Sequence, residues 1–374
     1  MYYNGVYHLF YQYNPYGAFW GNIVWAHSTS LDLINWVHLD HAISPTEPFD
    51  INDCWSGSVT ILPGSEPAIL YTALDSNKRE VQNLAVPKIL SDPLLKEWIK
   101  DPQNPVMSPI NGIKSSFFRD PTTAWQGLDG EWRIIEGNER EKRQGTALLY
   151  KSKDFLHWTE SDHPLHSSSK TGMWKCPDFF PVLLNGTNGL DTSVNDATVN
   201  HILKVSLFYE AHDYYILGSY VAEEKYIPDK DLTYTSSDMR LDYRKFYASK
   251  TFFDNAKKRR ILWGWINESD SPSDDIEKGW SGLQWPIKEI ETLRENRVSL
   301  QEEDLPGASG FEVSGIKLHR SSLRQDLDKT TYGAFVDVDP SHEKLSLRTL
   351  IDHSVVESFG GEGRTCITAR VYLG

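Results

Sequence analysis

The sequence has few cysteines, and none is arranged to bind a metal. Cys54, Cys176 and Cys366 lie far apart, and no Cys-x-x-Cys pair occurs. The sequence therefore predicts no zinc site and no redox motif. Because the count is odd, at least one thiol stays unpaired. The 12 His are scattered, so we interpret them as surface or core residues, and we expect neither a metal nor another cofactor.

Long apolar runs, an excess of positive charge and nucleotide-binding motifs are also missing. No apolar stretch approaches the roughly 18 residues of a membrane helix, so we predict no membrane span. The net charge of -14 argues against nucleic acid and fits a neutral sugar. No HExxH, phosphate loop or GxSxG motif occurs. No signal peptide is visible, since Met1 is followed at once by a strand-like segment.

Aromatic residues are plentiful instead, with 13 Trp, 18 Tyr and 15 Phe. Two interpretations are open for these rings. They can fill the core of a large all-β fold, and some Trp faces can stack on sugar rings. Both interpretations can hold at once for different residues.

A repeated pattern predicts the fold. A strand is followed by Ser-x-Asp, two apolar residues and a Trp, and successive Trp residues are 62 and 60 positions apart. The copies are Ser30–Trp36, Ser91–Trp98 and Ser152–Trp158, with a fainter one at Ser249–Asp254. A fixed period with short strands is typical of a propeller, and about 290 residues at about 60 per unit give five blades. A coincidental repeat in another β fold is the alternative.

The residue composition changes from about Glu291, which predicts a second domain. Glu and Arg dominate up to Leu305, and five short apolar segments follow. They span residues 311–315, 332–338, 345–351, 355–359 and 365–372, with a hairpin turn at 360–363. We therefore predict a propeller domain over 1–290 and an incomplete C-terminal β-sandwich over 305–374. Five strands of this length leave bare edges.

Several polar residues beside aromatic ones are candidates for a ligand site at the propeller centre. Arg119 and Asp120 interrupt an apolar segment. Asp120 can be a carboxylate of the site, or the two residues can form a structural ion pair or turn. Trp55 and Ser56 precede a strand, where a turn with a buried Trp is the alternative. Gln12, and Trp20 with its neighbouring Asn22, place amides beside aromatics, an arrangement that holds sugar hydroxyls.

Taken together, these segments resemble glycoside hydrolase family 32, the β-fructosidases. The matching stretches are Tyr7–Pro15, Trp20–Ser28, Trp55–Ser58, Phe118–Pro121, Tyr247–Phe253, Arg260–Ser269, Gly279–Gln284 and Ile351–Phe359. The resemblance covers nearly the whole chain and is greatest to plant cell-wall invertases and fructan exohydrolases, whose acid/base segment carries Pro after Cys, as Pro177 does here.

The resemblance implies a five-bladed β-propeller with a C-terminal β-sandwich, and retaining hydrolysis of a terminal fructofuranosyl residue of sucrose or fructans. Such a reaction needs a nucleophile and an acid/base carboxyl group. Asp120, with Arg119 beside it, matches the carboxylate that steadies the transition state. The positions that match the fructose subsite are Gln12, Trp20, Trp55 and Ser56. The resemblance also implies secretion to the cell wall, for which Asn185 and Asn267 are glycosylation candidates.

Two catalytic groups depart from the family pattern. The family nucleophile is the Asp of an Asn-Asp-Pro-Asn-Gly strand just before Met-Tyr-Tyr, and this sequence starts after it. The family acid/base is the Glu between Trp and Cys, where this chain has Lys175. An ammonium with an ordinary pKa of about 10.4 is a poor proton donor. We therefore expect impaired or absent hydrolysis. An ion pair between Lys175 and Asp120 is the structural alternative.

Further departures concern specificity and length. The segment Tyr220–Asp229 lacks an Asp that helps invertases hold glucose, which favours fructan over sucrose, although Glu223 or Glu224 can substitute. The sandwich is shortened between Gly315 and Arg320, and the chain ends early by the family pattern. Two alternatives stay open: a non-catalytic fructoside-binding protein that modulates active invertases, and an incomplete gene product.

Overall fold

A computed structural model describes residues 1–110, 112–221, 225–232 and 239–289, and in the C-terminal part 311–313, 333–336, 342, 344 and 346–372. Within these residues the chain is almost entirely β-structure, with one α-helix, α1 (Pro272–Lys278). Among the described helices, none has the length and hydropathy to span a membrane. Short strands rich in aromatic and β-branched residues account for this composition.

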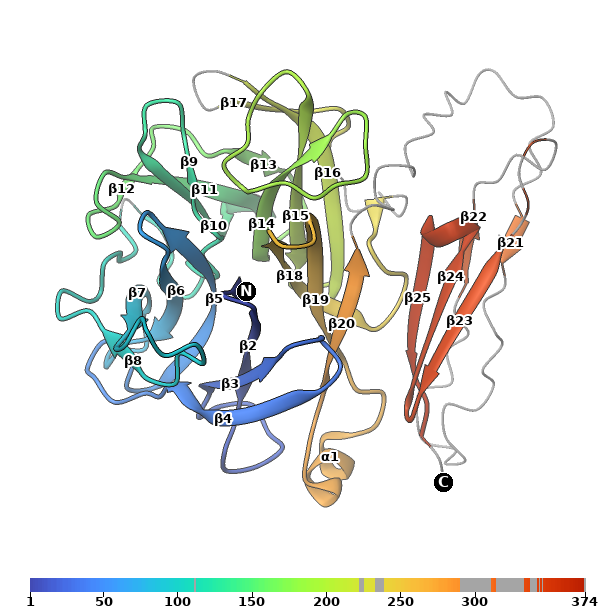
Figure 1. Ribbon diagram of the computed structural model, residues 1–374, viewed down its shortest axis with the longest axis horizontal. Coiled ribbons are helices and arrows are strands. Elements are labelled where there is room, and N and C mark those ends of the chain that lie inside the picture. The colour runs from blue at the N-terminus through green and yellow to red at the C-terminus, as the bar shows by residue number, and fades with distance from the viewer. Residues whose placement is uncertain are drawn as a thin grey trace.

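Five antiparallel sheets form a ring (Figure 1). The first has β1 (Tyr2–Tyr3), β2 (Val6–Tyr13), β3 (Val24–Ser30) and β4 (Trp36–Ile43). The second has β5 (Asp53–Leu62), β6 (Glu66–Leu74), β7 (Glu80–Pro87) and β8 (Trp98–Lys100). The third has β9 (Trp125–Gln126), β10 (Trp132–Arg140), β11 (Gln144–Ser152), β12 (Thr159–Glu160) and β13 (His166–Ser168).

The remaining two sheets complete the ring. The fourth has β14 (Trp174–Leu183), β15 (Val199–Leu207), β16 (His212–Val221) and β17 (Lys225–Pro228), and the fifth has β18 (Phe246–Asp254), β19 (Arg259–Ile266) and β20 (Leu283–Glu289). The Tyr7 hydroxyl donates to Asp254 Oδ2 at 2.7 Å, which ties the first sheet to the last. The predicted five-bladed propeller is confirmed, and the N-terminus lies at its centre (Figure 1).

The repeated segments form equivalent turns within their sheets. Ser30 and Ser152 each accept hydrogen bonds from the amides two and three residues on, and Asp32 and Asp154 accept the next two amides. Side chains of this type stabilise a turn by satisfying its own backbone. The prediction of a fourth copy of the turn is wrong. Ser249–Asp254 lies inside strand β18, where aromatic packing between sheets keeps the backbone extended.

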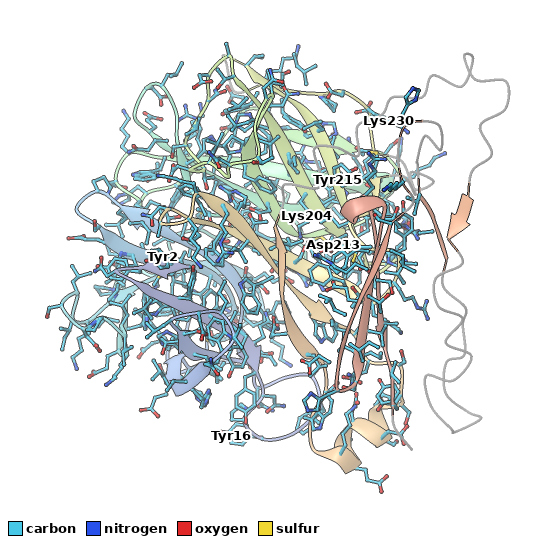
Figure 2. All side chains as sticks on the ribbon, turned by 45° about the vertical axis from the view of Figure 1, so that its right-hand side comes forward. Tyr2, Tyr16, Lys204, Asp213, Tyr215 and Lys230 are labelled. Atoms are coloured by element: carbon cyan, nitrogen blue, oxygen red, sulfur yellow. The ribbon has the colours of Figure 1, made fainter. Side chains whose placement is uncertain are left out.

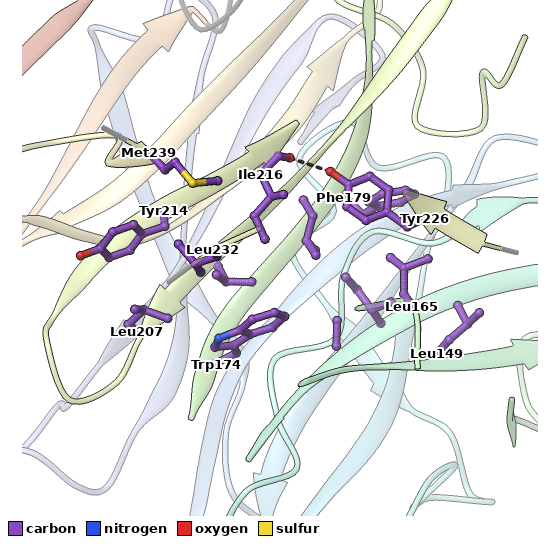
Figure 3. Close-up of a cluster of buried hydrophobic side chains, with 14 of the residues drawn as sticks. Leu149, Leu165, Trp174, Phe179, Leu207, Tyr214, Ile216, Tyr226, Leu232 and Met239 are labelled. Atoms are coloured by element: carbon purple, nitrogen blue, oxygen red, sulfur yellow. Dashed lines mark hydrogen bonds between the residues drawn. The ribbon is translucent and has the colours of Figure 1, made fainter. Parts of the chain in front are cut away.

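Tight packing between the third and fourth sheets fixes the start of β14. A buried cluster there contains Trp174, Phe179 and Tyr226, and the Tyr226 hydroxyl donates to the Ile216 carbonyl at 2.8 Å (Figure 3). A Cβ on Gly137 would lie 2.1 Å from the Trp174 carbonyl oxygen. Only glycine allows β10 to approach β14 so closely, and this approach positions the residues that follow Trp174.

The C-terminal strands lie beside the ring (Figure 1). They are β21 (Phe311–Val313) paired with β22 (Ala334–Val336), and β23 (Leu347–Asp352), β24 (Val355–Gly360) and β25 (Thr365–Arg370). The predicted hairpin turn is present as a 3-10 turn, Gly361–Gly363. The Tyr243 and Lys245 amides donate to carbonyls of Cys366 and Thr368, so β25 docks on the propeller. The proposed domain boundaries at 290 and 305 lie outside the described residues and stay predictions.

Candidate functional site

The predicted subsite residues lie together where the first two sheets meet. Gln12 Nε2 donates to Ser56 Oγ at 2.8 Å, linking the first two sheets. The rings of Trp20 and Trp55 have centroids 6.4 Å apart. Trp20 is 65% exposed, so its face is free to cover a ligand. Four candidates that are distant in sequence therefore form one aromatic and amide surface.

Arg119 is held in this surface by a partner that the sequence did not indicate. Its guanidinium pairs with Glu80 and lies 5.0 Å from the Trp55 ring centroid. Burial raises the pKa of Glu80 to about 6, although Arg119 opposes that shift. The structural alternative, an ion pair between Arg119 and Asp120, is not what forms: Arg119 binds Glu80, and Asp120 points elsewhere.

Asp120 is buried and oriented by backbone contacts. Its amide donates to Thr72 Oγ1 at 2.7 Å, and its Oδ2 accepts from the Cys176 amide at 2.7 Å. Asp120 and Cys176 both have left-handed backbones, with φ of 69° and 42°. Such conformations are costly for residues other than glycine and concentrate at functional sites. The hydrogen bond between the two residues holds this carboxylate beside Lys175.

Lys175 does not form an ion pair with Asp120, which was the structural alternative. Its ammonium lies 5.2 Å from the Phe208 ring centroid and 5.5 Å from that of Tyr247. Among the described residues, no carboxylate lies within ion-pair distance of Lys175 Nζ. The reason is geometric, because Asp120 is turned toward the Cys176 amide and two aromatic rings flank the ammonium.

Other cations near the site are fully engaged. Lys250 Nζ donates to Ser58 Oγ and to the Asp120 and Pro121 carbonyls at 2.7 to 3.0 Å. Lys204 Nζ lies 3.7 Å from Asp213 Oδ2 and donates to the Ser249 carbonyl; Figure 2 labels both Lys204 and Asp213. Sequence reasoning missed these residues. The signal in the sequence that could have identified them is a charged residue inside an otherwise apolar strand.

Glu136 is a further buried carboxyl group next to this site. Neither of its oxygens has a hydrogen-bond partner among the described residues. Burial raises its pKa well above the usual value, Lys250 opposes the shift, and Asp120 and Glu80 add to it. Burial therefore favours the neutral form of this carboxyl group, as expected for an acid without a partner in a low-dielectric environment.

A second group of acids lies at the junction between propeller and C-terminal strands. Oxygens of Glu268, Asp270 and Asp275 approach one another within 4.8 Å. The Lys278 ammonium contacts all three, at 3.1, 2.9 and 2.5 Å. Because the Lys278 ammonium contacts all three acids and Arg370 also pairs with Glu268, protein cations already hold these carboxylates together, and the arrangement gives no reason to place a metal there.

The remaining predicted residues are away from the site or outside the described part. Asn185 is exposed on the turn after β14, and Asn267 is partly exposed after β19. Their glycosylation stays a prediction. Glu223 and Glu224, the possible substitutes for the missing glucose-binding Asp, lie outside the described residues. Cys54, Cys176 and Cys366 are all buried.

Comparison with protein families gives two matches in succession. Residues 1–303 match the glycosyl hydrolases family 32 N-terminal domain, and residues 311–373 match the family's C-terminal domain. The chain is 47% identical to the insoluble β-fructofuranosidase isoenzyme CWINV3 of Arabidopsis thaliana, over the whole chain and 81% of that protein. It is 43% identical to fructan 6-exohydrolase of Beta vulgaris, over the whole chain and 78% of that protein.

Solved structures agree with the sequence relatives. Fructan 1-exohydrolase IIa from Cichorium intybus in complex with 1-kestose is 42% identical, with a TM-score of 0.88, over 99% of this chain and 88% of that one. Exo-inulinase from Aspergillus awamori, at 18% identity and a TM-score of 0.73, shares the fold. With family models matching both parts and relatives above 40% identity, the chain belongs to glycoside hydrolase family 32, a family of glycosidases.

Proposed function

We propose that the site binds the terminal fructofuranosyl residue of sucrose or of fructans, and that hydrolysis is impaired because Lys175 occupies the position of the acid/base carboxyl group. The joined surface of Gln12, Ser56, Trp20 and Trp55 supports the binding role. Relatives named as β-fructofuranosidases and fructan exohydrolases, and a neighbour in complex with 1-kestose, support the ligand class. Names that include the cell wall support secretion to that location.

The single observation that carries the impairment is the environment of Lys175. General acid/base catalysis typically contributes about 10²–10⁴-fold. Lys175 has no carboxylate partner within the described residues, and the carboxylate of Asp120 accepts a hydrogen bond from the Cys176 amide instead. In the proposed function Asp120 stabilises the positive charge of the transition state, but no side chain at the Lys175 position donates a proton readily.

Binding and turnover are tested separately. Titration calorimetry with sucrose, 1-kestose and short inulins is expected to show binding that Trp20→Ala weakens, because the exposed ring covers the ligand. Absence of heat at millimolar ligand would count against the binding role. Assays with sucrose, inulin and levan are expected to show little or no turnover, and rates typical of the family would defeat the impairment.

Restoring the acid identifies the cause of the impairment. A variant with Lys175→Glu and an Asn-Asp-Pro-Asn-Gly segment ahead of Met1 is expected to hydrolyse fructosides at least about 100-fold faster than one with that segment alone. Equal rates in the two variants would show that Lys175 is not the block. A non-catalytic role, with binding that modulates active invertases, is favoured if binding is retained and restoration fails.

A further inference from the structure

Strand β23 is the open edge of the sheet that joins the C-terminal strands to the propeller. The amides of Tyr243 and Lys245 donate to one edge of β25, and β24 pairs with its other edge. Beyond β24, β23 has no further strand partner among the described residues. Its pairing with β24 is regular and contains no bulge. A row of backbone N–H and C=O groups therefore lies unpaired along the outer edge of β23.

The side chains of β23 leave this edge unprotected. Leu347, Leu350 and Ile351 are 56%, 45% and 74% exposed. Proteins usually protect an edge strand with Pro, Lys or a bulge, and the sequence of β23 contains neither Pro nor Lys. A strand that combines exposed apolar side chains with free backbone groups is a template on which another strand can pair.

The residues of β23 match a second copy of the same strand. In an antiparallel pair related by a two-fold axis, opposed residues lie on the same face of the sheet, so the pair must be centred on a residue. Centring on Leu350 places Arg348 of each copy opposite Asp352 of the other and brings the two Leu350 side chains together. Moving the centre to Thr349 or Ile351 places one of these charges opposite Leu350 instead. The charges therefore select one register.

Both charged side chains can take part in this pairing. The Arg348 guanidinium lies 5.2 Å from the Phe359 ring centroid, and no acid pairs with it among the described residues. The Asp352 carboxylate is 2.6 Å from Nδ1 of the exposed His353. An arginine can keep its contact with an aromatic face while its fork of donors binds a carboxylate. Each cross-strand pair of opposite charges adds stability to an antiparallel sheet.

We propose that two copies of this chain associate through antiparallel pairing of their β23 strands, centred on Leu350, so that the sheet of one copy continues into that of the other. The association is weak. A single strand pair buries less than the roughly 1,200 Å² at the lower end of stable interfaces, and the net charge of -14 on each copy opposes it. The dimer therefore forms at high protein concentration.

Cysteine cross-linking tests the register. In Leu350→Cys the two new thiols lie opposite each other, with Cα atoms about 4.5–5.5 Å apart, a separation that a disulfide spans. Mild oxidation of concentrated protein is expected to convert most of this variant to a covalent dimer. Leu347→Cys is the matched control, because this residue is exposed on the same strand but its two copies lie about 20 Å apart along the pair. This control and the wild type, whose thiols are buried, are expected to stay monomeric.

Charge exchange tests the specificity. Arg348→Asp is expected to weaken dimerisation about tenfold in sedimentation equilibrium, because two attractive pairs become repulsive. Adding Asp352→Arg to this variant is expected to restore the dimer. The sedimentation series uses no cysteine variant, so it decides the matter even if Leu350→Cys does not fold. Equal cross-linking of Leu350→Cys and Leu347→Cys, no covalent dimer of folded Leu350→Cys, or dimerisation that is unchanged by Arg348→Asp would overturn the inference.

Discussion

Lys278 at the junction and Lys175 at the centre of the propeller are both partly exposed lysines with opposite surroundings. Lys278 contacts three carboxylates, whereas Lys175 contacts two aromatic rings. Burial acts to lower the pKa of Lys278, but the hydrogen bonds that its ammonium donates to Asp270, Asp275 and Glu268 outweigh burial and raise the pKa. The cation matched by carboxylates holds two parts of the fold together, whereas the charge of Lys175 has no carboxylate partner among the described residues.

The junction depends on its matched charges. Glu268 also accepts from Arg370 and from the Tyr372 hydroxyl, so the acid cluster fastens the end of β25 to the propeller. In the propeller, by contrast, one cation and one acid both lack such partners. Lys175 lacks an anion, and Glu136 lacks any hydrogen-bond donor among the described residues.

The largest expected effect is at the junction. Lys278→Met leaves three clustered carboxylates without their shared cation and is expected to destabilise the protein by about 3 kcal/mol, the low end for a broken buried pair because the side chain is 21% exposed. Urea denaturation measures the change. Lys153→Met removes an exposed lysine 3.5 Å from Glu131 and is the control, with an expected change below about 0.5 kcal/mol. Equal losses of stability in the two variants would show that the three carboxylates around Lys278 add no stability beyond that of an exposed ion pair.

A smaller effect is expected at Glu136. Glu136→Leu removes two buried oxygens that lack partners and is expected to stabilise the protein by about 1–3 kcal/mol at neutral pH. Because the folded-state pKa of Glu136 is raised, the unfolded chain loses this proton first as pH rises, and the group lowers stability above about pH 4.3.

Glu136→Gln isolates that titration. The stability difference between this variant and the wild type is expected to grow from pH 4 to pH 8, measured by denaturant unfolding at each pH. A stability difference that stays constant over this range would mean that Glu136 ionises normally. The contrast between Glu136 and the paired charges of the junction would then be lost.

The smallest effect on stability is expected at Lys175. Lys175→Gln breaks no ion pair and is expected to change the free energy of unfolding by no more than about 0.5 kcal/mol. A loss of stability comparable to that of Lys278→Met would assign Lys175 a structural role and would remove the contrast between the two lysines.

Sequence reasoning succeeded where local pattern determines structure. The Ser-x-Asp turns at Ser30 and Ser152 depend on hydrogen bonds within a few residues, so their period predicted the five sheets. It failed at Ser249–Asp254, where the letters resemble that turn but β18 forms instead. Packing against neighbouring sheets outweighed the local preference at that position.

By itself the sequence determined the architecture and the family, because short-range hydrogen bonds and alternating apolar residues specify strands and turns. It also named the residues of the surface that Gln12, Ser56, Trp20 and Trp55 form. Only the tertiary structure decided which charges meet. It paired Arg119 with Glu80 and turned Asp120 toward the Cys176 amide. Within the described residues it left Lys175 without an ion-pair partner and Glu136 without a hydrogen-bond partner. Electrostatic energies depend on distance and burial across the fold, and neither quantity is contained in the order of residues along the chain.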